Sequence, residues 1–194
     1  MGKFVVLTGL DGSGTSSVAE KLLEKDRGAF FYKSLPKLYS EKREEIDIAT
    51  KYDSPTAHLY YYLSANCYLS DQIKKSKADN PKSNIYCVRY FIDTVVSQRA
   101  SGIDIAYEHK QDYFDLIKPN YIFFLDVDET ERQRRLDNRG KGFLDLTLDD
   151  NNVRERFLKE FQQIESEYIK INTTNRSLDE IADEILNYIN SEEV

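Results

Sequence analysis

The sequence predicts a doubly wound α/β fold, in which a parallel sheet of about five strands carries helices on both faces. Short apolar runs alternate with longer segments that have one apolar helical face, and this order produces strand–helix–strand units. The chain of 194 residues fits one domain better than two. No internal repeat or low-complexity linker divides it. We therefore expect residues 1–194 to form a single domain.

The expected strands are short runs rich in β-branched and aromatic residues, as is typical of buried parallel strands. They are Lys3–Thr8, Ala29–Tyr32, Ile85–Val88, Tyr121–Val127 and Ile169–Asn172. The expected helices lie between and after these strands. They are Ser16–Lys25, Ser40–Lys51, Thr56–Lys75, Phe91–Ala100, Glu129–Arg139, Val153–Tyr168 and a last helix that Ser177 and Glu180 open with a capping box and that runs to about Ile189.

Composition narrows the class of protein. The net charge of −7 argues against a nucleic-acid or anionic-membrane partner, because phosphate groups repel an acidic surface. The two cysteines are too few for a disulfide scaffold. No apolar stretch approaches the ~20 residues of a membrane span, and Phe4–Leu7 is too short for a signal-peptide core. We expect a cytoplasmic protein with a small-molecule partner, and the long helix Thr56–Lys75 could support a homodimer.

A glycine-rich turn follows the first strand. Its sequence, Gly9-Leu-Asp-Gly-Ser-Gly-Thr-Ser16, matches the phosphate-loop pattern G-x-x-x-x-G-K-[ST] except that Thr15 replaces the lysine. The glycines allow the backbone N–H groups to point inward, and the following helix adds its positive end. Ser16 is placed to ligate Mg²⁺. The expected phosphate-binding residues are Gly9, Gly12, Ser13, Gly14, Thr15, Ser16 and Ser17.

Several blocks of the chain resemble thymidylate kinases, within the nucleoside-monophosphate kinases. They are the phosphate loop with Asp11, the block Ser64-Ala-Asn66, and Arg89-Tyr90 followed eight residues later by Gln98. The resemblance implies a P-loop kinase fold that uses ATP and Mg²⁺ and takes a nucleotide acceptor. It also implies that Arg89 holds the acceptor phosphate, that Asp11 contacts the sugar 3′-hydroxyl, and that Asn66 and Gln98 belong to the acceptor site.

A basic segment follows the strand Tyr121–Val127. Arg132–Lys141 contains five positive charges in ten residues. Such a run is either a solvated helix face or part of a ligand site, since open α/β sheets bind ligands at the carboxyl ends of their strands. We favour the second interpretation. The family resemblance implies that Arg135 and Arg139 act catalytically over the ATP phosphates, next to a mobile lid near residues 139–152.

The chain also departs from the family at polar positions. Thr15 replaces the lysine, Val88 the acid before Arg89, and Cys67 the arginine that reads thymine; Leu63 replaces an aromatic residue and Asp93 a serine. The favoured function is transfer of the ATP γ-phosphoryl group to a nucleoside monophosphate or a related nucleotide. The alternative is a degenerate homologue that binds nucleotide as a sensor or scaffold. A third possibility is a kinase for a nucleoside or another small molecule.

Two further features leave alternatives open. Asp126, at the end of an expected strand, is either a metal-ligating acid or a hydrogen-bond acceptor at the strand end. The aromatic run Tyr60–Tyr62 is more often helix packing than a base clamp.

Overall fold

A computed structural model describes residues 1–103, 114–140 and 151–191. Its sheet is parallel throughout, with the strand order β2-β3-β1-β4-β5. This arrangement confirms the predicted fold class. The strands are β1 (Phe4–Thr8), β2 (Phe30–Lys33), β3 (Ile85–Val88), β4 (Tyr121–Asp126) and β5 (Ile169–Asn172).

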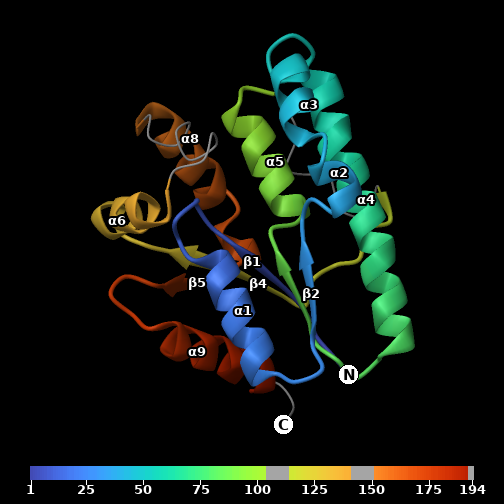
Figure 1. The fold of residues 1–194 in the computed structure, drawn as a ribbon, viewed down its shortest axis with the longest axis vertical. Helices are drawn as coiled ribbons and strands as arrows, with labels where there is room; N and C mark the ends of the chain where they lie inside the picture. Colours follow the sequence, from blue (N-terminus) through green and yellow to red (C-terminus); the bar gives the residue numbers. More distant parts are fainter. Residues whose placement is uncertain (104–113, 141–150, 192–194) are drawn as a thin grey trace.

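Helices cover both faces of the sheet (Figure 1). One face carries α1 (Thr15–Lys25) and α9 (Leu178–Asn190), which contact each other. The other carries α4 (Pro55–Asp79), α5 (Phe91–Ala100) and α8 (Asn151–Gln162). Three further helices lie along these layers. They are α2 (Lys37–Ser40), α3 (Arg43–Thr50) and α6 (Glu129–Arg139).

The central strand β1 shows why the sheet needs both layers. Its side chains alternate between the faces, so Val5 and Leu7 pack in the cluster that contains α1 and α9, whereas Phe4 and Val6 pack in the cluster that contains α4 and α5. All four residues are fully buried. The continuous apolar run of the sequence therefore reflects a strand covered on both sides.

Two expected helices differ from the structure. The helix expected over Val153–Tyr168 ends at Gln162, and a 3₁₀ turn, η2 (Glu165–Glu167), follows it. Tyr168 has an extended backbone and stacks on Phe124, with ring centroids 5.0 Å apart. The chain has to leave the helix early to bring this ring onto the sheet.

The second difference lies after β2. Pro36 precedes a separate short helix, α2, and the charged helix α3 begins only at Arg43. The expected lid lies mostly in residues 141–150, outside the described residues. The carboxyl ends of β1, β3, β4 and β5 share one edge of the sheet. The glycine loop, Arg89 and the segment after β5 therefore lie near one another.

Candidate nucleotide-binding site

The loop between β1 and α1 depends on its glycines. Gly9, Gly12 and Gly14 all have positive φ angles, of 150°, 90° and 97°. A Cβ at Gly9 would lie 2.6 Å from the Leu125 carbonyl oxygen, and one at Gly12 would lie 2.9 Å from Arg132 Cγ. These approaches are too close for any other residue. The tight turn that aims the backbone inward thus requires glycine at these positions.

The start of α1 is suited to an anion. The helix begins at Thr15, no side chain caps its first N–H groups, and its first turn has no acidic residue. The buried Ser13 hydroxyl has no hydrogen-bond partner among the described residues, while Ser16 and Ser17 are exposed. Open N–H groups at a helix N-terminus bind phosphate. The cradle and the uncommitted serines fit ATP phosphates with Mg²⁺.

Thr15 does not replace the charge of the lysine. It is buried, with 8% of its surface exposed, and its hydroxyl carries no charge. Any positive charge at the loop must come from other residues, and two arginines of α6 contact the loop directly.

Arg132 is a structural support for the loop. Its side chain is fully buried, and two of its nitrogens donate to Glu129 at 2.7 and 2.9 Å. The third donates to the carbonyl oxygen of Asp11 at 3.0 Å. A buried guanidinium needs such partners. Arg132 thus belongs neither to a solvated face nor to the lid, and it fixes the middle of the loop.

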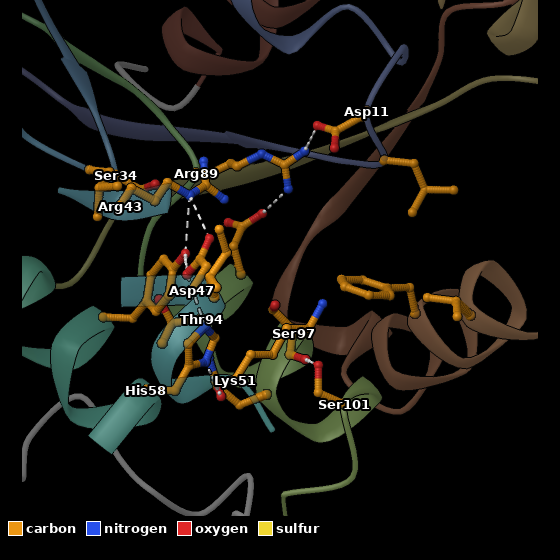
Figure 2. A pocket seen from close by; sticks show the side chains of 18 of the residues that line it. Asp11, Ser34, Arg43, Asp47, Lys51, His58, Arg89, Thr94, Ser97 and Ser101 are labelled. Atoms are coloured by element: carbon orange, nitrogen blue, oxygen red, sulfur yellow. Dashed lines mark hydrogen bonds and ion pairs between the residues drawn. The ribbon is translucent and has the colours of Figure 1, made fainter. Parts of the chain in front are cut away.

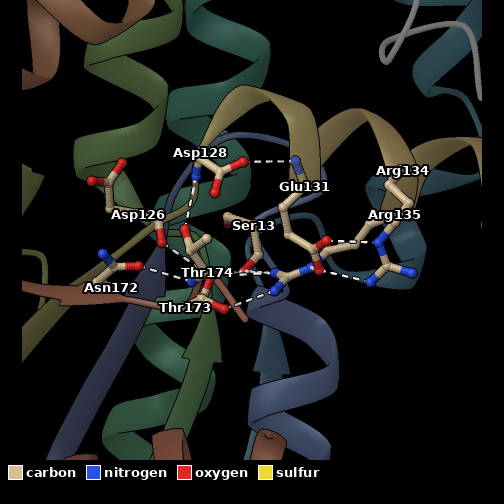
Figure 3. Close-up of polar contacts among 9 residues, drawn as sticks. All are labelled: Ser13, Asp126, Asp128, Glu131, Arg134, Arg135, Asn172, Thr173 and Thr174. Carbon is tan, nitrogen blue, oxygen red and sulfur yellow. Dashed lines mark hydrogen bonds and ion pairs between the residues drawn. The ribbon is translucent and has the colours of Figure 1, made fainter. Parts of the chain in front are cut away.

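Arg135 lies against the end of the loop (Figure 3). It donates from Nη1 to the Ser13 carbonyl oxygen at 3.2 Å and from Nη2 to the Thr173 carbonyl oxygen at 2.7 Å. Its Nε donates to Glu131 at 2.8 Å, and the exposed Arg134 also pairs with Glu131. Hydrogen bonds from Arg134 and Arg135 lower the pKa of Glu131 to about 2. Two cations share one carboxylate, so one positive charge remains in excess beside the loop.

The structure says less about Arg139, the second arginine predicted to act over the ATP phosphates. Arg139 is the last residue of α6 and is exposed. The ten residues that follow Gly140 lie outside the described part of the chain. The predicted role of Arg139 over the phosphates therefore stays a prediction.

Arg89 follows β3 and has an unusual backbone. Its φ angle is 64°, a left-handed conformation that costs a non-glycine residue about 1–3 kcal/mol. Its Nη2 lies 2.6 Å from Asp11 Oδ1, and its Nη1 lies 3.4 Å from Asp93 Oδ1. Burial alone would lower the pKa of Arg89, but the two carboxylates outweigh it and raise the pKa. The strain and the paired acids hold this cation at the loop.

Asp93, which takes the place of a serine in the family pattern, anchors this arrangement. It is buried and accepts hydrogen bonds from the Thr8 hydroxyl at 2.6 Å and from the Tyr90 backbone N–H at 3.0 Å. Burial raises its pKa, and Arg89 and these donors offset part of that rise. The carboxylate thus ties the ends of β1 and β3 to the start of α5.

A cavity of about 470 Å³ opens beside the loop. Gly9, Leu10 and Asp11 line it on the loop side, and the remaining walls come mainly from α3, α4, α5 and α8. Figure 2 shows Asp11 and Arg89 together at one end, with His58 farther away. The cavity therefore extends from the phosphate loop toward a second group of polar side chains.

These polar side chains form a network. Asp47 Oδ1 lies 3.0 Å from His58 Nε2 and 2.8 Å from the Tyr62 hydroxyl, and Asp47 Oδ2 lies 3.4 Å from Arg43 Nε. The amide of Gln98 lies 3.0–3.1 Å from His58 Nδ1. Burial acts to raise the pKa of Asp47, but hydrogen bonds from His58 and Tyr62 and the charge of Arg43 lower it overall. Asp47 is therefore an ionised acceptor.

Two acceptor residues were expected from the family blocks, Gln98 and Asn66, and the structure places them differently. Gln98 lines the cavity, but Asn66 does not. Asn66 is buried and donates to Thr94 Oγ1 at 2.8 Å and to the Tyr62 carbonyl oxygen at 3.0 Å. Leu63 is also buried, in the core cluster between α4 and the sheet. The course of α4 turns both side chains away from the cavity, so neither is placed to contact a base.

Most of the cavity residues were not expected in the site, among them Arg43, Asp47 and His58. In the sequence, Arg43 and Asp47 look like parts of a charged helix and His58 like an isolated histidine. Only the packing of α3 against α4 brings them together.

The two open alternatives are also clarified. Asp126 pairs with Lys170 of β5 at 2.9 Å, and its carbonyl oxygen accepts from Thr173. In the aromatic run, Tyr60 is 61% exposed, whereas Tyr62 belongs to the cavity network. The Asp126 carboxylate thus has an ion-pair partner at the strand end, and its metal-ligating alternative stays a prediction. Within the run, Tyr62 is the tyrosine whose side chain joins the Asp47 network.

A glycine loop that leads from a central parallel strand into an open helix, next to a cavity at the carboxyl edge of the sheet, defines the class of P-loop nucleotide kinases. The sequence profile described as thymidylate kinase matches residues 7–185. The chain belongs to the thymidylate kinase family.

Individual relatives agree with this assignment. A probable thymidylate kinase of Methanococcus maripaludis is 28% identical over 200 residues, covering 97% of this chain and 96% of that protein. The thymidylate kinase of Brachyspira hyodysenteriae is 26% identical over 201 residues, covering 100% of this chain and 96% of that protein. The chain is an ATP-dependent nucleoside-monophosphate kinase that resembles thymidylate kinase. Both relatives are named as kinases, and neither match supports the degenerate alternative.

Solved structures show the same fold. The thymidylate kinase of Candida albicans superposes with a TM-score of 0.71 at 20% identity, covering 99% of this chain and 92% of that chain. A deoxyadenosine kinase from M. mycoides superposes with a TM-score of 0.64 at 15% identity, covering 97% of this chain and 99% of that chain. The family uses ATP and Mg²⁺ in general. No helix among the described residues is both long and apolar enough to cross a membrane.

Proposed function

We propose that this chain transfers the ATP γ-phosphoryl group to a nucleoside monophosphate at the junction of loop and cavity. One observation carries the proposal: Gly9, Leu10 and Asp11 belong to the phosphate loop and also line the cavity. A donor phosphate on the loop and an acceptor phosphate in the cavity would meet there. Phosphoryl transfer consists mostly of such positioning together with charge neutralisation.

On the donor side, the backbone N–H groups from Gly12 to Ser17 hold the ATP phosphates. The exposed Ser16 hydroxyl would hold Mg²⁺, an ion that proteins usually bind through one or two side chains together with substrate phosphates. When bound, the metal neutralises phosphate charge. Within the described residues, no cluster of three His, Cys, Asp or Glu side chains offers a metal site made by protein alone.

Arg135 supplies the positive charge that Thr15 lacks. Its Nη1 lies 3.6 Å from the position of a Cβ on Gly14, at the last turn before the helix. The Arg135 guanidinium itself acts on phosphate at this point. Arg139 adds to it from the end of α6. Both are fixed on one helix, so the charge need not be carried by the loop itself.

On the acceptor side, Arg89 binds the acceptor phosphate. It pairs with Asp11 and Asp93 in the structure. A phosphate would take over hydrogen bonds of the guanidinium, since Arg matches phosphate oxygens bidentately. Asp11 would then be released to accept from the sugar 3′-hydroxyl, and Gln98 lies deeper in the cavity toward the base.

The test is a screen of ATP consumption with Mg²⁺ across all common nucleoside monophosphates and nucleosides. Turnover of monophosphates supports the proposal. Turnover of nucleosides alone would move the acceptor to an unphosphorylated compound. ATP binding without turnover of any acceptor would instead favour the alternative function, a sensor or scaffold that binds nucleotide. We also propose that residues 1–194 act as one domain; the homodimer stays a prediction for measurement by sedimentation.

A further inference from the structure

Arg43, the first residue of α3, lines the cavity with a guanidinium that is anchored at one side. Its Nε donates to the Tyr62 hydroxyl at 3.1 Å and lies 3.4 Å from Asp47 Oδ2. Its Cζ lies 5.9 Å from the centroid of the Tyr62 ring, within the range of a cation–π contact. For Nη1 and Nη2, the described part of the chain offers no acceptor. The side chain is thus held by one nitrogen, and its outer two remain available to a ligand within this part of the chain.

The groups that anchor Arg43 are themselves fixed. Asp47 is buried, lies 3.0 Å from His58 Nε2 and accepts from the Tyr62 hydroxyl at 2.8 Å. These contacts join α3 to α4 and leave the Arg43 side chain 38% exposed. An arginine held in this way loses little further freedom when a ligand binds, so its contribution to affinity is large.

Arg89 differs from Arg43 in how its charge is compensated. Its Nη2 lies 2.6 Å from Asp11 Oδ1, and its Nη1 lies 3.4 Å from Asp93 Oδ1. Two carboxylates therefore face one guanidinium. A phosphate monoester carries a charge of about −1.5 to −2 near neutral pH, and at Arg89 alone it would meet an excess of negative charge. A phosphate in the cavity therefore needs a second cation.

Arg43 is placed to be that cation. Figure 2 shows its guanidinium directed toward the end of the cavity that holds Ser34 and Arg89, whereas Lys51 lies farther away. The Ser34 N–H donates to the Val88 carbonyl oxygen at 3.0 Å, and Arg89 follows Val88 directly. One arginine fork binds two phosphate oxygens, so the third oxygen of a monoester needs another donor. The outer nitrogens of Arg43 supply it.

We infer that Arg43 is a second ligand of the acceptor phosphate, which it binds together with Arg89. Asp47 and Tyr62 are positioning residues that hold Arg43 by its Nε. The acceptor is then a phosphate monoester, because an unphosphorylated nucleoside would leave the Arg43 fork unused. The inference rests on the proposed function, since it assigns the cavity to the acceptor.

The experiment compares the binding of monophosphates with that of their nucleosides by calorimetry. The probes are thymidylate, CMP and AMP, each beside its nucleoside. In the wild type, at least one monophosphate should bind more tightly than its nucleoside. In Arg43→Ala that difference should shrink by about 10- to 100-fold, the value of hydrogen bonds to a charged group. The affinity of the nucleoside should stay within about twofold. Equal losses for both compounds would assign Arg43 to the base and overturn the inference, as would the absence of any difference in the wild type.

Two further variants control for the fold. Lys42→Ala is the matched control, because Lys42 directly precedes Arg43 but is exposed and pairs only with Glu45; it should keep the full preference for the monophosphate. Arg43→Lys keeps a positive charge at the start of α3 but lacks the planar fork, so its preference should lie between those of the wild type and Arg43→Ala. A preference as large as that of the wild type in both folded Arg43 variants would overturn the inference.

Kinetics and binding together separate this inference from the kinase reaction. In an active enzyme, Arg43→Ala should raise KM for the acceptor and leave KM for ATP unchanged, a split that general loosening of the fold would not produce. A phosphate-dependent loss of binding without any turnover would support the inference while rejecting the kinase reaction. Turnover of monophosphates with the same acceptor KM in wild type and Arg43→Ala would do the reverse.

Discussion

The donor and acceptor sides of the site are built in opposite ways. The donor side comes from one continuous segment, in which glycines expose main-chain N–H groups at the start of α1. The acceptor side comes from side chains on α3, α4, α5 and the end of β3. A main-chain site leaves its signature in the local sequence, whereas a side-chain site depends on how distant elements pack.

The donor and acceptor sides should therefore respond differently to amino-acid substitutions. The loop should tolerate no Cβ at its glycines, yet its missing lysine can be replaced from another element. The cavity network should lose stability when one of its members changes, because its groups satisfy one another. The following predictions test this contrast, beginning with the largest effect.

The largest effect is expected for the cation that replaces the lysine. Arg135→Ala removes positive charge beside the transferring group and should reduce turnover by about 10³-fold, by analogy with arginine fingers. Its melting temperature should change little. Steady-state kinetics and a thermal melt measure both. Arg134→Ala is the matched control, because Arg134 shares Glu131 but is exposed, and it should keep most activity.

Arg139→Ala is expected to reduce turnover in the same direction. Thr15→Lys in the Arg135→Ala background should partly restore it if the two cations share a role. Full activity in both arginine variants would reject charge compensation from α6.

A Cβ on the loop gives the next largest effect. Gly14 has a φ angle of 97°, so Gly14→Val strains the turn and crowds the phosphates. We expect ATP affinity to fall by about 100-fold, or ~2.7 kcal/mol. Gly28→Val is the matched control, because Gly28 has a φ of 94° and open space around it. Calorimetry should show unchanged ATP affinity for that control. Equal ATP affinity in both variants would show that the loop does not bind the ATP phosphates.

On the acceptor side, Asp47→Asn should lower the free energy of unfolding by about 2 kcal/mol near neutral pH. Asp47 has a lowered pKa in the folded state, so its stabilisation is present above the unfolded value of about 4 and is lost as the pH falls through the lowered value. The difference from wild type should therefore shrink over the acidic range below about pH 4. Urea unfolding across this range measures it; a constant difference would show that the charge is not responsible.

The same contrast explains what the sequence could predict. The alternation of strands and helices located all five strands, and the bounds of β3, β5, α5 and α6 agree with those expected. The phosphate loop was visible because its function lies in consecutive residues. Arg132 was grouped with Arg135 because both belong to one charge run, although one is buried under the loop and the other lies at its edge.

The acceptor side was predicted less completely for a physical reason. Asn66 lies within a family block, but the helix turns it toward Thr94. Asp47 and His58 lie eleven positions apart in the sequence, and neither has a local pattern that indicates a hydrogen-bonded pair. Their contact depends on the angle between α3 and α4, which no short segment determines.

The smallest effect is expected for Tyr62→Phe, which removes a hydroxyl that donates to Asp47 and accepts from Arg43 Nε at 3.1 Å. Burial raises the pKa of Tyr62 above its usual value, so the hydroxyl stays protonated and donates to Asp47 at 2.8 Å. Loss of the bond to Asp47 should cost about 1 kcal/mol of unfolding free energy, the usual net value of a hydrogen bond, because Arg43 is partly exposed and turns to water instead. His58 and Arg43 still hold the carboxylate, so most of the stability of the network should persist. Urea unfolding of both variants measures the difference. A loss of stability as large as that of Asp47→Asn would show that the tyrosine rather than the His58–Asp47 pair organises the cavity.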